Sequence, residues 1–178
     1  MDIIIAGGGI VGCYTGQLLR RKGFNPIIFE EHPEVGKPVQ CAGLIGKETV
    51  ETSKLPFPEE VILRRIDGAR FFLGNDSFEI ERARAAYVLD RARLDKLLSR
   101  GLDIRTGERV IEFEEHDTIE VVTERGTYWC DLLLGCDGPF SVIRKMGAFA
   151  LKAKFYPGAQ YIVQTAPEDD FLELHVHP

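Results

Sequence analysis

The chain has 178 residues, of which 44% are hydrophobic, so it can bury a core and form one or two domains. It carries 28 Asp and Glu against 22 Lys and Arg, and the net charge of -6 argues against nucleic acid as the main partner. No apolar run approaches the roughly 18 residues of a membrane span, and the chain opens on a strand pattern rather than a signal peptide, which predicts a cytoplasmic protein.

The first thirty residues follow a pattern of strand, glycine turn, helix, strand and acid. An apolar strand is predicted over residues 3–6 and runs into Gly7-Gly8-Gly9-Ile10-Val11-Gly12. The spacing of apolar residues predicts a helix over residues 10–22. A second strand over residues 26–29 leads to Glu30. The side chains expected on the buried face of the helix are Val11, Tyr14, Leu18 and Leu19.

This order is the fingerprint of a dinucleotide-binding site, and each part has a physical role. Gly7 allows a tight turn, Gly9 lets the backbone approach a pyrophosphate, and Gly12 lets the helix pack against the sheet. The phosphates would lie at the helix N-terminus, where unpaired N–H groups and the positive end of the dipole favour an anion. Glu30 would accept hydrogen bonds from both ribose hydroxyls and repel a 2′-phosphate, which indicates FAD or NAD and not NADP. A glycine turn that closes a loop without a ligand is the alternative.

The middle of the chain predicts a loop followed by β-structure. Residues 31–54 predict an irregular segment, and residues 56–60, with two prolines, predict a linker. Strand patterns over residues 69–73 and 77–81 flank Gly74-Asn75-Asp76, a good hairpin turn. These strands are assigned to a β-rich layer inserted into the nucleotide domain.

The chain then returns to the nucleotide domain. A helix is predicted over residues 90–98, with Asp90 as its N-cap. Three strand patterns joined by polar turns predict an antiparallel meander over residues 109–114, 118–123 and 127–134. The apolar run 132–135 is typical of a central strand in a parallel sheet. A short helix over residues 141–146 and two further strands, over residues 159–165 and 171–176, complete the pattern.

The cysteines predict reduced thiols and no metal site. They are Cys13, Cys41, Cys130 and Cys136. None forms a CxxC pair, and no histidine lies at zinc-finger spacing from them. Small apolar packing is expected for all except Cys41, which lies in the predicted irregular segment.

Four blocks of sequence, taken together, resemble one family. They are Gly7-x-Gly9-x-x-Gly12 with Glu30, then Pro38-Val39-Gln40-Cys41-Ala42-Gly43, then Asp90-Arg91-x-x-Leu94-Asp95-x-x-Leu98, then Gly135-Cys136-Asp137-Gly138-x-x-Ser141-x-x-Arg144-Lys145. From Met1 to about Met146 this set resembles the flavin-dependent geranylgeranyl reductase family, within the p-hydroxybenzoate-hydroxylase-like FAD-binding flavoproteins. The second and third blocks are the more specific, since the glycine and Asp-Gly motifs alone indicate only a flavoprotein.

The resemblance implies an α/β fold with two parts. Residues 1–55 and 88–150 would form a Rossmann-like FAD-binding domain that includes the three-stranded antiparallel meander. Residues 56–87 and 151–178 would form part of an inserted β-rich substrate domain. Members of the family are roughly twice as long and carry a downstream Gly-Asp motif that this sequence lacks, so an N-terminal portion of a longer protein is expected.

The resemblance also implies contacts with FAD. Gly7, Gly9, Val11 and Gly12 would line the ADP pyrophosphate, with Glu30 on the adenosine ribose. The residues expected to pass close to the flavin, mostly through backbone atoms, are Cys41, Ala42, Gly43 and Leu44. The remaining expected contacts are Arg91 on the flavin side, Val110 at the adenine through its backbone, and Asp137 with Gly138 where the last strand of the sheet ends. No catalytic residue is assigned, although Cys41 is a candidate; simple loop packing of Cys41 and a solvated Arg91 are the alternatives.

The activity implied by the resemblance is reduction of carbon–carbon double bonds in geranylgeranyl chains of lipids, with hydride supplied by reduced FAD. The electron donor stays open between a reduced nicotinamide and a ferredoxin-like protein. Peripheral membrane contact and self-association through exposed sheet edges are further expectations. Two alternatives remain: another FAD-dependent oxidoreductase, such as an aromatic hydroxylase or a quinone-linked dehydrogenase, and a non-catalytic module that binds an adenine nucleotide.

Overall fold

The computed structural model describes residues 1–164 and 169–176. It divides into two compact units, which are described separately. The first comprises Met1–Val39 and Ala92–Pro157, and the second comprises Gln40–Arg91 and Gly158–Pro178. The domain boundaries predicted from the sequence fall after residues 55, 87 and 150, and they remain a prediction.

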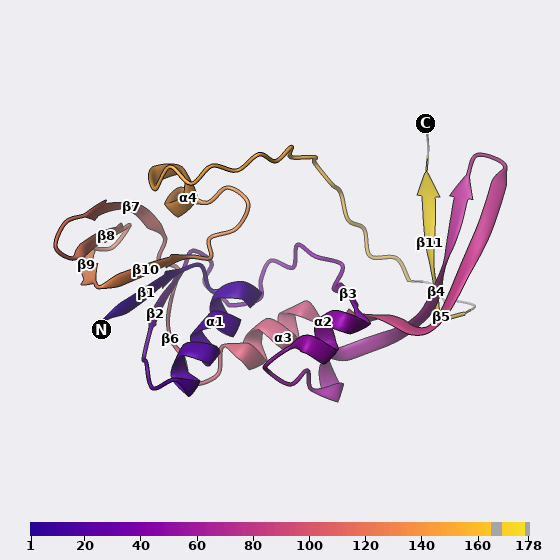
Figure 1. Ribbon diagram of the computed structural model, residues 1–178, viewed down its shortest axis with the longest axis horizontal. Coiled ribbons are helices and arrows are strands. Elements are labelled where there is room, and N and C mark those ends of the chain that lie inside the picture. Colours follow the sequence, from indigo (N-terminus) through magenta and orange to yellow (C-terminus); the bar gives the residue numbers. More distant parts are fainter. Residues whose placement is uncertain (165–168, 177–178) are drawn as a thin grey trace. The chain divides into compact units, whose positions relative to one another are not determined.

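The first unit is built on a parallel sheet of four strands, in agreement with the predicted α/β class (Figure 1). Its strands lie in the order β10 (Leu132–Gly135), β1 (Ile3–Ala6), β2 (Ile27–Glu30) and β6 (Asp103–Thr106). The central strand β1 is fully buried, because one face of the sheet packs on a helix and the other on a second, antiparallel sheet. The strand β6 was not predicted.

The two faces of β1 alternate as the strand period requires. Ile3 and Ile5 pack with Ile28 and with Leu19 of α1 (Ile10–Arg21). The other face packs against the meander of β7 (Val110–Glu115), β8 (Ile119–Thr123) and β9 (Thr127–Cys130). Figure 1 shows α1 and the meander on opposite sides of the sheet. The predicted meander is therefore confirmed, except that its third strand, predicted over residues 127–134, ends at Cys130 and is followed by β10 of the parallel sheet.

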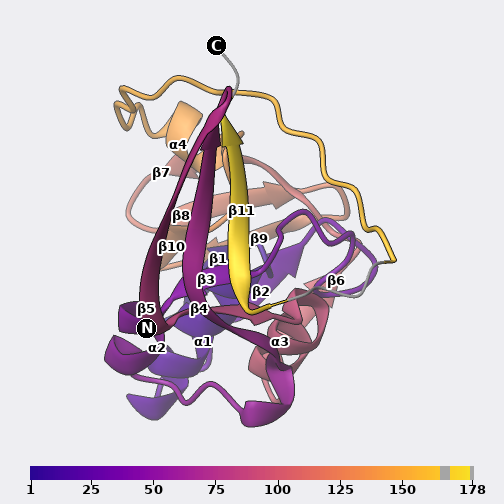
Figure 2. The same ribbon diagram turned by 90° about the vertical axis from the view of Figure 1, so that its right-hand side faces the viewer.

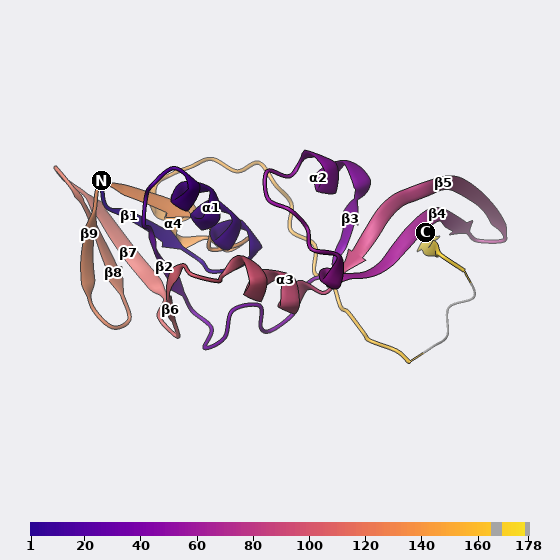
Figure 3. The same ribbon diagram turned by 90° about the horizontal axis from the view of Figure 1, so that it is seen from below.

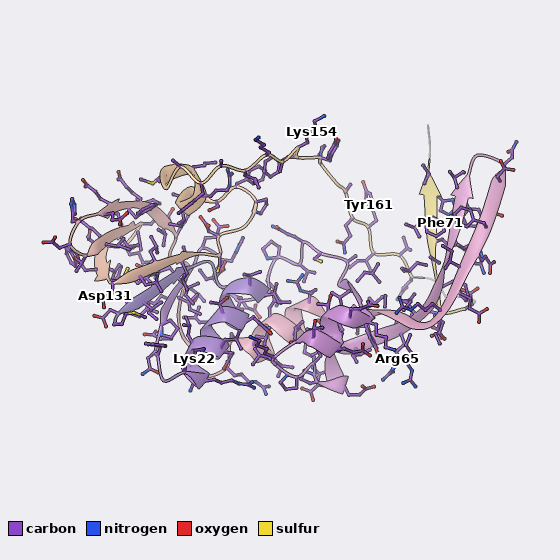
Figure 4. The ribbon with its side chains drawn as sticks, in the orientation of Figure 1. Lys22, Arg65, Phe71, Asp131, Lys154 and Tyr161 are labelled. Carbon is purple, nitrogen blue, oxygen red and sulfur yellow. The ribbon has the colours of Figure 1, made fainter. Side chains whose placement is uncertain are left out.

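The predicted buried face of α1 is confirmed at Leu19, which packs on the core, but it is wrong at Val11. Its buried residues are Gly12, Cys13 and Gly16, whereas Val11 is 61% exposed. Large residues at positions 12, 13 and 16 would hold the helix away from the sheet, so the small residues form the contact. The helix otherwise matches its predicted span, and Lys22 lies just past its last residue (Figure 4).

The strand β10 was predicted to lie in the centre of the sheet, and this is wrong for the described residues. There it pairs only with β1 and forms an edge. Its residues Leu132, Leu133 and Leu134 are partly buried because the two faces of the sheet are covered. The apolar run 132–135 therefore indicates that both faces of the strand are covered, but it does not indicate whether the strand is paired on one edge or on both.

Two short helices complete the first unit. The helix α3 (Arg91–Leu98) buries Leu94 and Asp95, and the side-chain amide of Gln17 donates to the carbonyl oxygens of Leu98 and Arg100 beyond it. The helix α4 (Val142–Met146) begins after Ser141, whose Oγ accepts a hydrogen bond from the N–H of Arg144. Both helices were predicted.

The second unit contains a sheet in the order β11-β4-β5-β3 (Figure 2). Its elements are β3 (Leu44–Gly46), α2 (Lys47–Thr52), the 3-10 turn η1 (Glu59–Val61), β4 (Ile62–Leu73), β5 (Asp76–Leu89) and β11 (Phe171–Val176). The predicted hairpin is confirmed but is much longer, and Figure 3 shows it as a curved ribbon. A register shift lies where Arg84, with φ of 53°, donates its N–H to Asp67 Oδ1. The short elements β3 and α2 lie in the segment predicted as irregular.

The outer part of this sheet has one apolar and one charged face. Directly paired residues share a face, so Phe71, Phe78 and Leu174 lie together, and Phe71 stacks on Phe78 with ring centroids 4.8 Å apart (Figure 4). The other face carries Arg70, which is hydrogen-bonded to Glu79. The large side chains exposed on the apolar face are Leu73, Phe78, Ile80, Leu174 and Val176.

The segment between α4 and β11 has no regular secondary structure in residues 148–164. The strand predicted over residues 159–165 is therefore wrong for residues 159–164, and Thr165 lies outside the described residues. Tyr161, Ile162 and Val163 favour strands by composition, but their side chains are 72–92% exposed and gain no packing there. Within the described ranges, no helix is long and apolar enough to cross a bilayer.

Candidate nucleotide-binding site

The glycine turn lies at the carboxyl end of β1, between β10 and β2. Gly7 has φ of 100°, and its N–H donates to the carbonyl oxygen of Phe29 at 2.7 Å. A Cβ on Gly7 would lie 2.3 Å from the carbonyl oxygen of Cys136, so a side chain is excluded at this position. The carboxyl edge of a parallel sheet is where open α/β folds bind ligands.

The beginning of α1 leaves room for an anion. Gly9 is the N-cap residue, and its carbonyl oxygen accepts the first helical hydrogen bond, from Cys13 N–H at 2.9 Å. The N–H groups of the first turn precede this hydrogen-bond ladder and point out of the helix. No acidic side chain lies in the first turn, and a Cβ on Gly9 would meet no atom within 4 Å. The space and the donors both suit a phosphate group.

The predicted ribose ligand, Glu30, is held in place from both sides. The residue is 8% exposed, and Oε2 accepts the N–H of Gly8 at 2.7 Å. Oε1 accepts the backbone N–H of His32 at 2.9 Å and lies 2.6 Å from His32 Nδ1. The glycine turn and the end of β2 are therefore joined through one carboxylate.

The Asp-Gly motif lies beside the glycine turn. A Cβ on Gly7 would lie 2.9 Å from the backbone nitrogen of Asp137, so the two segments touch. Asp137 Oδ2 accepts the N–H groups of Val142 and Ile143, at 2.6 and 3.3 Å, at the start of α4. Asp137 Oδ1 is buried without a hydrogen-bond partner in the described residues. A buried carboxylate oxygen in this position is ready to accept a hydrogen bond from a ligand.

Val110, predicted to touch the adenine through its backbone, begins β7 with its side chain in the core. The loop before it is fixed by Glu108, which is 4% exposed. Glu108 Oε1 accepts hydrogen bonds from Thr123 Oγ1 at 2.7 Å and from the Tyr128 hydroxyl at 2.9 Å. The side chain of Val110 is therefore held in the core and is not available to a ligand.

The remaining predicted residues belong to the second unit. Cys41 is exposed, and its Sγ accepts the N–H of Gly43 at 3.4 Å. Gly43 has φ of 77°, and a Cβ there would lie 2.2 Å from the carbonyl oxygen of Leu89. Ala42 is exposed, and Leu44 begins β3. Arg91 begins α3.

The structure thus brings one group of predicted residues together in the first unit. Gly7, Gly9, Gly12, Glu30 and Asp137 surround the end of β1, with Gly138 directly after Asp137 and Val11 exposed in the first turn of α1. Sequence reasoning missed Gly8, His32 and Glu108. The close spacing of Glu30 and His32 was the only local signal for these contacts. The individual ligand contacts remain predictions.

Three of the four thiols, those of Cys13, Cys130 and Cys136, are poor nucleophiles. Cys13 Sγ donates to the carbonyl oxygen of Gly8 at 3.1 Å, and burial, followed by the charges of Asp95 and Glu30, raises the pKa of Cys13 to about 12. Burial also raises the pKa values of Cys130 and Cys136. The thiolate is the reactive form of cysteine, so these three side chains are inert near neutral pH.

We therefore expect one fast-reacting thiol in the folded chain. At pH 8 roughly one Cys13 in 10⁴ is ionised, because the pH lies about four units below its pKa. Titration with a chromogenic disulfide should label Cys41, which is exposed, and leave the other three until urea is added. Cys41→Ser should remove the fast phase. A second thiol that reacts as fast as Cys41 would contradict the burial described above.

Comparison with known proteins agrees with this geometry. Residues 5–45 match the family model of an NAD(P)-binding Rossmann-like domain. The chain is 28% identical over 167 residues to the "Uncharacterized protein in nifH2 5′ region" of Methanosarcina barkeri, covering 84% of this chain and 89% of that protein. It is 27% identical over 166 residues to digeranylgeranylglycerophospholipid reductase 2 of Methanothermobacter thermautotrophicus, covering 82% of this chain and 42% of that one.

Two solved structures share the fold. One is a geranylgeranyl bacteriochlorophyll reductase-like protein of Thermoplasma acidophilum, with a TM-score of 0.70, 19% identity, and coverage of 85% of this chain and 42% of that one. The other is CtdE in complex with FAD, with a TM-score of 0.65, 24% identity, and coverage of 82% and 40%. The chain spans about two-fifths of the length of the reductase and of both solved proteins. The resemblance to geranylgeranyl reductases and the Rossmann-like fold are therefore confirmed, and FAD, the predicted cofactor, is bound in one of the related structures.

Proposed function

We propose that this chain binds FAD at the glycine turn and serves a flavin-dependent reduction of carbon–carbon double bonds in the geranylgeranyl chains of lipids. The observation that carries the proposal is the turn itself: an uncrowded Gly9 at the start of α1, with Glu30 fixed beside it by Gly8. The similarity to digeranylgeranylglycerophospholipid reductases supports the choice of reaction.

The residues of the first unit fit the ADP half of FAD. The first turn of α1 offers backbone N–H groups and no acidic side chain to a diphosphate. Glu30 is an acceptor for the ribose, and its negative charge disfavours a 2′-phosphate. The buried, unpartnered Asp137 Oδ1 supplies one more acceptor beside the turn.

The protein's own part in the reaction is to bind and to orient. Bound FAD, once reduced, supplies a hydride to one carbon of the double bond, and a proton is added to its neighbour. The fixed carboxylate of Glu30 and the rigid turn at Gly7 set the position of the adenosine end, which fixes the reach of the rest of the cofactor. The electron donor that we propose is a reduced nicotinamide or a ferredoxin-like protein.

The second unit supports an apolar substrate. One face of its sheet presents Phe71, Phe78, Ile80 and Leu174 together, with Asp76 on the same face opposite Leu73. A prenyl chain is bound mainly by removal of apolar surface from water, at about 25 cal/mol for each Å². We include peripheral contact with a lipid surface in the proposal, since the substrate is a lipid.

An absorption spectrum tests the cofactor, and a lipid assay tests the reaction. The purified chain, mixed with FAD and freed of excess by gel filtration, should show visible flavin bands that dithionite bleaches and that phenolic substrates leave unchanged. The chain extended to the length of the reductase relatives should then consume reductant when given a geranylgeranyl lipid. A colourless chain that does not retain FAD would refute the proposal, and flavin bands with oxidation of a phenol would favour a hydroxylase.

A further inference from the structure

We infer that His32 is a positioning residue that sets how many ribose hydroxyls Glu30 can bind, so that the nucleotide competes with the imidazole for one carboxylate oxygen. This inference rests on the proposed function, because it concerns the same nucleotide site. Neither the resemblance nor the glycine fingerprint assigns a role to this histidine.

The inference follows from the acceptor sites of Glu30. A carboxylate has about four lone-pair sites, two on each oxygen. Oε1 has two donors, the backbone N–H of His32 at 2.9 Å and the His32 ring at 2.6 Å. Because an ionised carboxylate only accepts hydrogen bonds, Nδ1 of the ring is the donor. Oε2 has one donor, the N–H of Gly8 at 2.7 Å.

One acceptor site is therefore left, on Oε2, while a ribose offers two hydroxyl donors. The first hydroxyl can bind Oε2 with the protein unchanged. The second hydroxyl can bind Oε1 only if the imidazole leaves it, because the backbone N–H of His32 is fixed by its position after β2. The His32 carbonyl oxygen accepts the N–H of Gly107 at 2.9 Å, which fixes this backbone further.

The imidazole can move where the backbone cannot. Its side chain is 37% exposed, and Nε2 of the ring lies 4.0 Å from Oε1 of Glu31. Glu31 is itself paired with Arg109, at 3.5 Å. A rotation of the ring towards solvent would therefore break one hydrogen bond, to Glu30, and leave the glycine turn intact.

The test is a double-mutant cycle between His32 and the ribose hydroxyls, measured by calorimetry with ADP, 2′-deoxy-ADP and 3′-deoxy-ADP on the 178-residue chain. In the parent, removal of the hydroxyl that competes with the ring should weaken binding only about 2-fold. The hydrogen bond that this hydroxyl makes to Glu30 replaces the one from the His32 imidazole, so little is gained when it forms. In His32→Ala the same removal should weaken binding about 10-fold, the value of one charge-assisted hydrogen bond. His32→Ala should also bind ADP itself about 5-fold more tightly than the parent.

Two variants make the result specific. His32→Asn retains a donor at the position of Nδ1 and should restore the small penalty of the parent. His116→Ala is the matched control, since His116 also follows a glutamate two positions earlier, Glu114, with Nε2 and Oε2 3.6 Å apart, and should change none of the three affinities. Circular dichroism checks that each variant is folded.

The outcomes separate the inference from the proposed function. Equal hydroxyl penalties in the parent and in His32→Ala, or weaker ADP binding by His32→Ala, would overturn the role of His32 and leave the nucleotide site standing. Failure of every variant and of the parent to bind ADP would instead refute the nucleotide site itself. A penalty that grows in His32→Ala and shrinks again in His32→Asn is the expected result.

Discussion

Gly9→Val should abolish tight nucleotide binding while leaving the fold intact. The Cβ of a residue at position 9 would meet no atom of the described residues within 4 Å, so the added side chain enters the space that faces the first turn of α1. A diphosphate would lose at least two charge-assisted hydrogen bonds there, and we expect FAD and ADP to bind about 100-fold more weakly, or ~2.7 kcal/mol. Fluorescence titration with FAD and calorimetry with ADP measure the loss.

The cost of Gly9→Val to stability should be small. Gly9 is an N-cap residue with extended backbone, φ of -72° and ψ of -170°, which valine can adopt. Replacement of an N-cap glycine by valine costs about 1 kcal/mol. Gly158→Val is the control, because a Cβ there also meets no atom within 4 Å and lies outside the glycine turn. Unchanged FAD binding by Gly9→Val would show that no phosphate lies at this helix end.

Gly12→Ala should instead destabilise the fold, by about 3 kcal/mol. Its Cβ would lie 1.9 Å from the carbonyl oxygen of Gly7 and 3.0 Å from the Gly7 carbonyl carbon. Both atoms belong to the backbone, and the hydrogen bond from the Gly7 N–H to the Phe29 carbonyl oxygen fixes this turn. Neither atom can therefore move away without a loss of stability. The free energy of unfolding from urea denaturation measures the effect.

Gly16→Ala in the same helix is the matched control. A Cβ on Gly16 would lie 3.0 Å from Ile28 Cδ1 and 3.1 Å from Leu102 Cδ1, which are the ends of flexible side chains. Alanine also gains about 1 kcal/mol of helix propensity over glycine. Gly16→Ala should therefore stay within about 1 kcal/mol of the parent. Equal stabilities of the two variants would contradict the close approach of α1 to the glycine turn.

These contrasts also indicate what could be predicted from the sequence. The glycine turn was found because its strand, helix and acid follow one another within thirty residues. The position of Glu30 came from spacing, but its partner Gly8 lies 22 residues away, and no local pattern reports such a contact. The error at Val11 in α1 has a similar cause: the prediction followed the periodicity of large apolar residues, whereas the fully buried positions of the helix are the small residues Gly12, Cys13 and Gly16.

The strands show the same limit. The second strand of the hairpin was predicted to end at Glu81, whereas β5 continues to Leu89. Arg82 and Arg84 interrupt the apolar alternation there although the backbone continues past a bulge. No strand was predicted at β6, where Asp103, Arg105 and Thr106 leave no apolar alternation to detect. It is a strand because it pairs with β2, and this pairing depends on the tertiary structure and not on the local sequence.

The parallel pairing of β1 with β10 has a consequence for synthesis of the protein. Ile3 of β1 pairs with Leu132 of β10, so the ribosome synthesises this partner strand 129 residues after β1. At about 5–20 residues per second this delay is roughly 6 to 26 s. During that time one edge of a wholly apolar strand waits unpaired on the nascent chain, which makes the amino-terminal segment a natural client for a chaperone acting during translation.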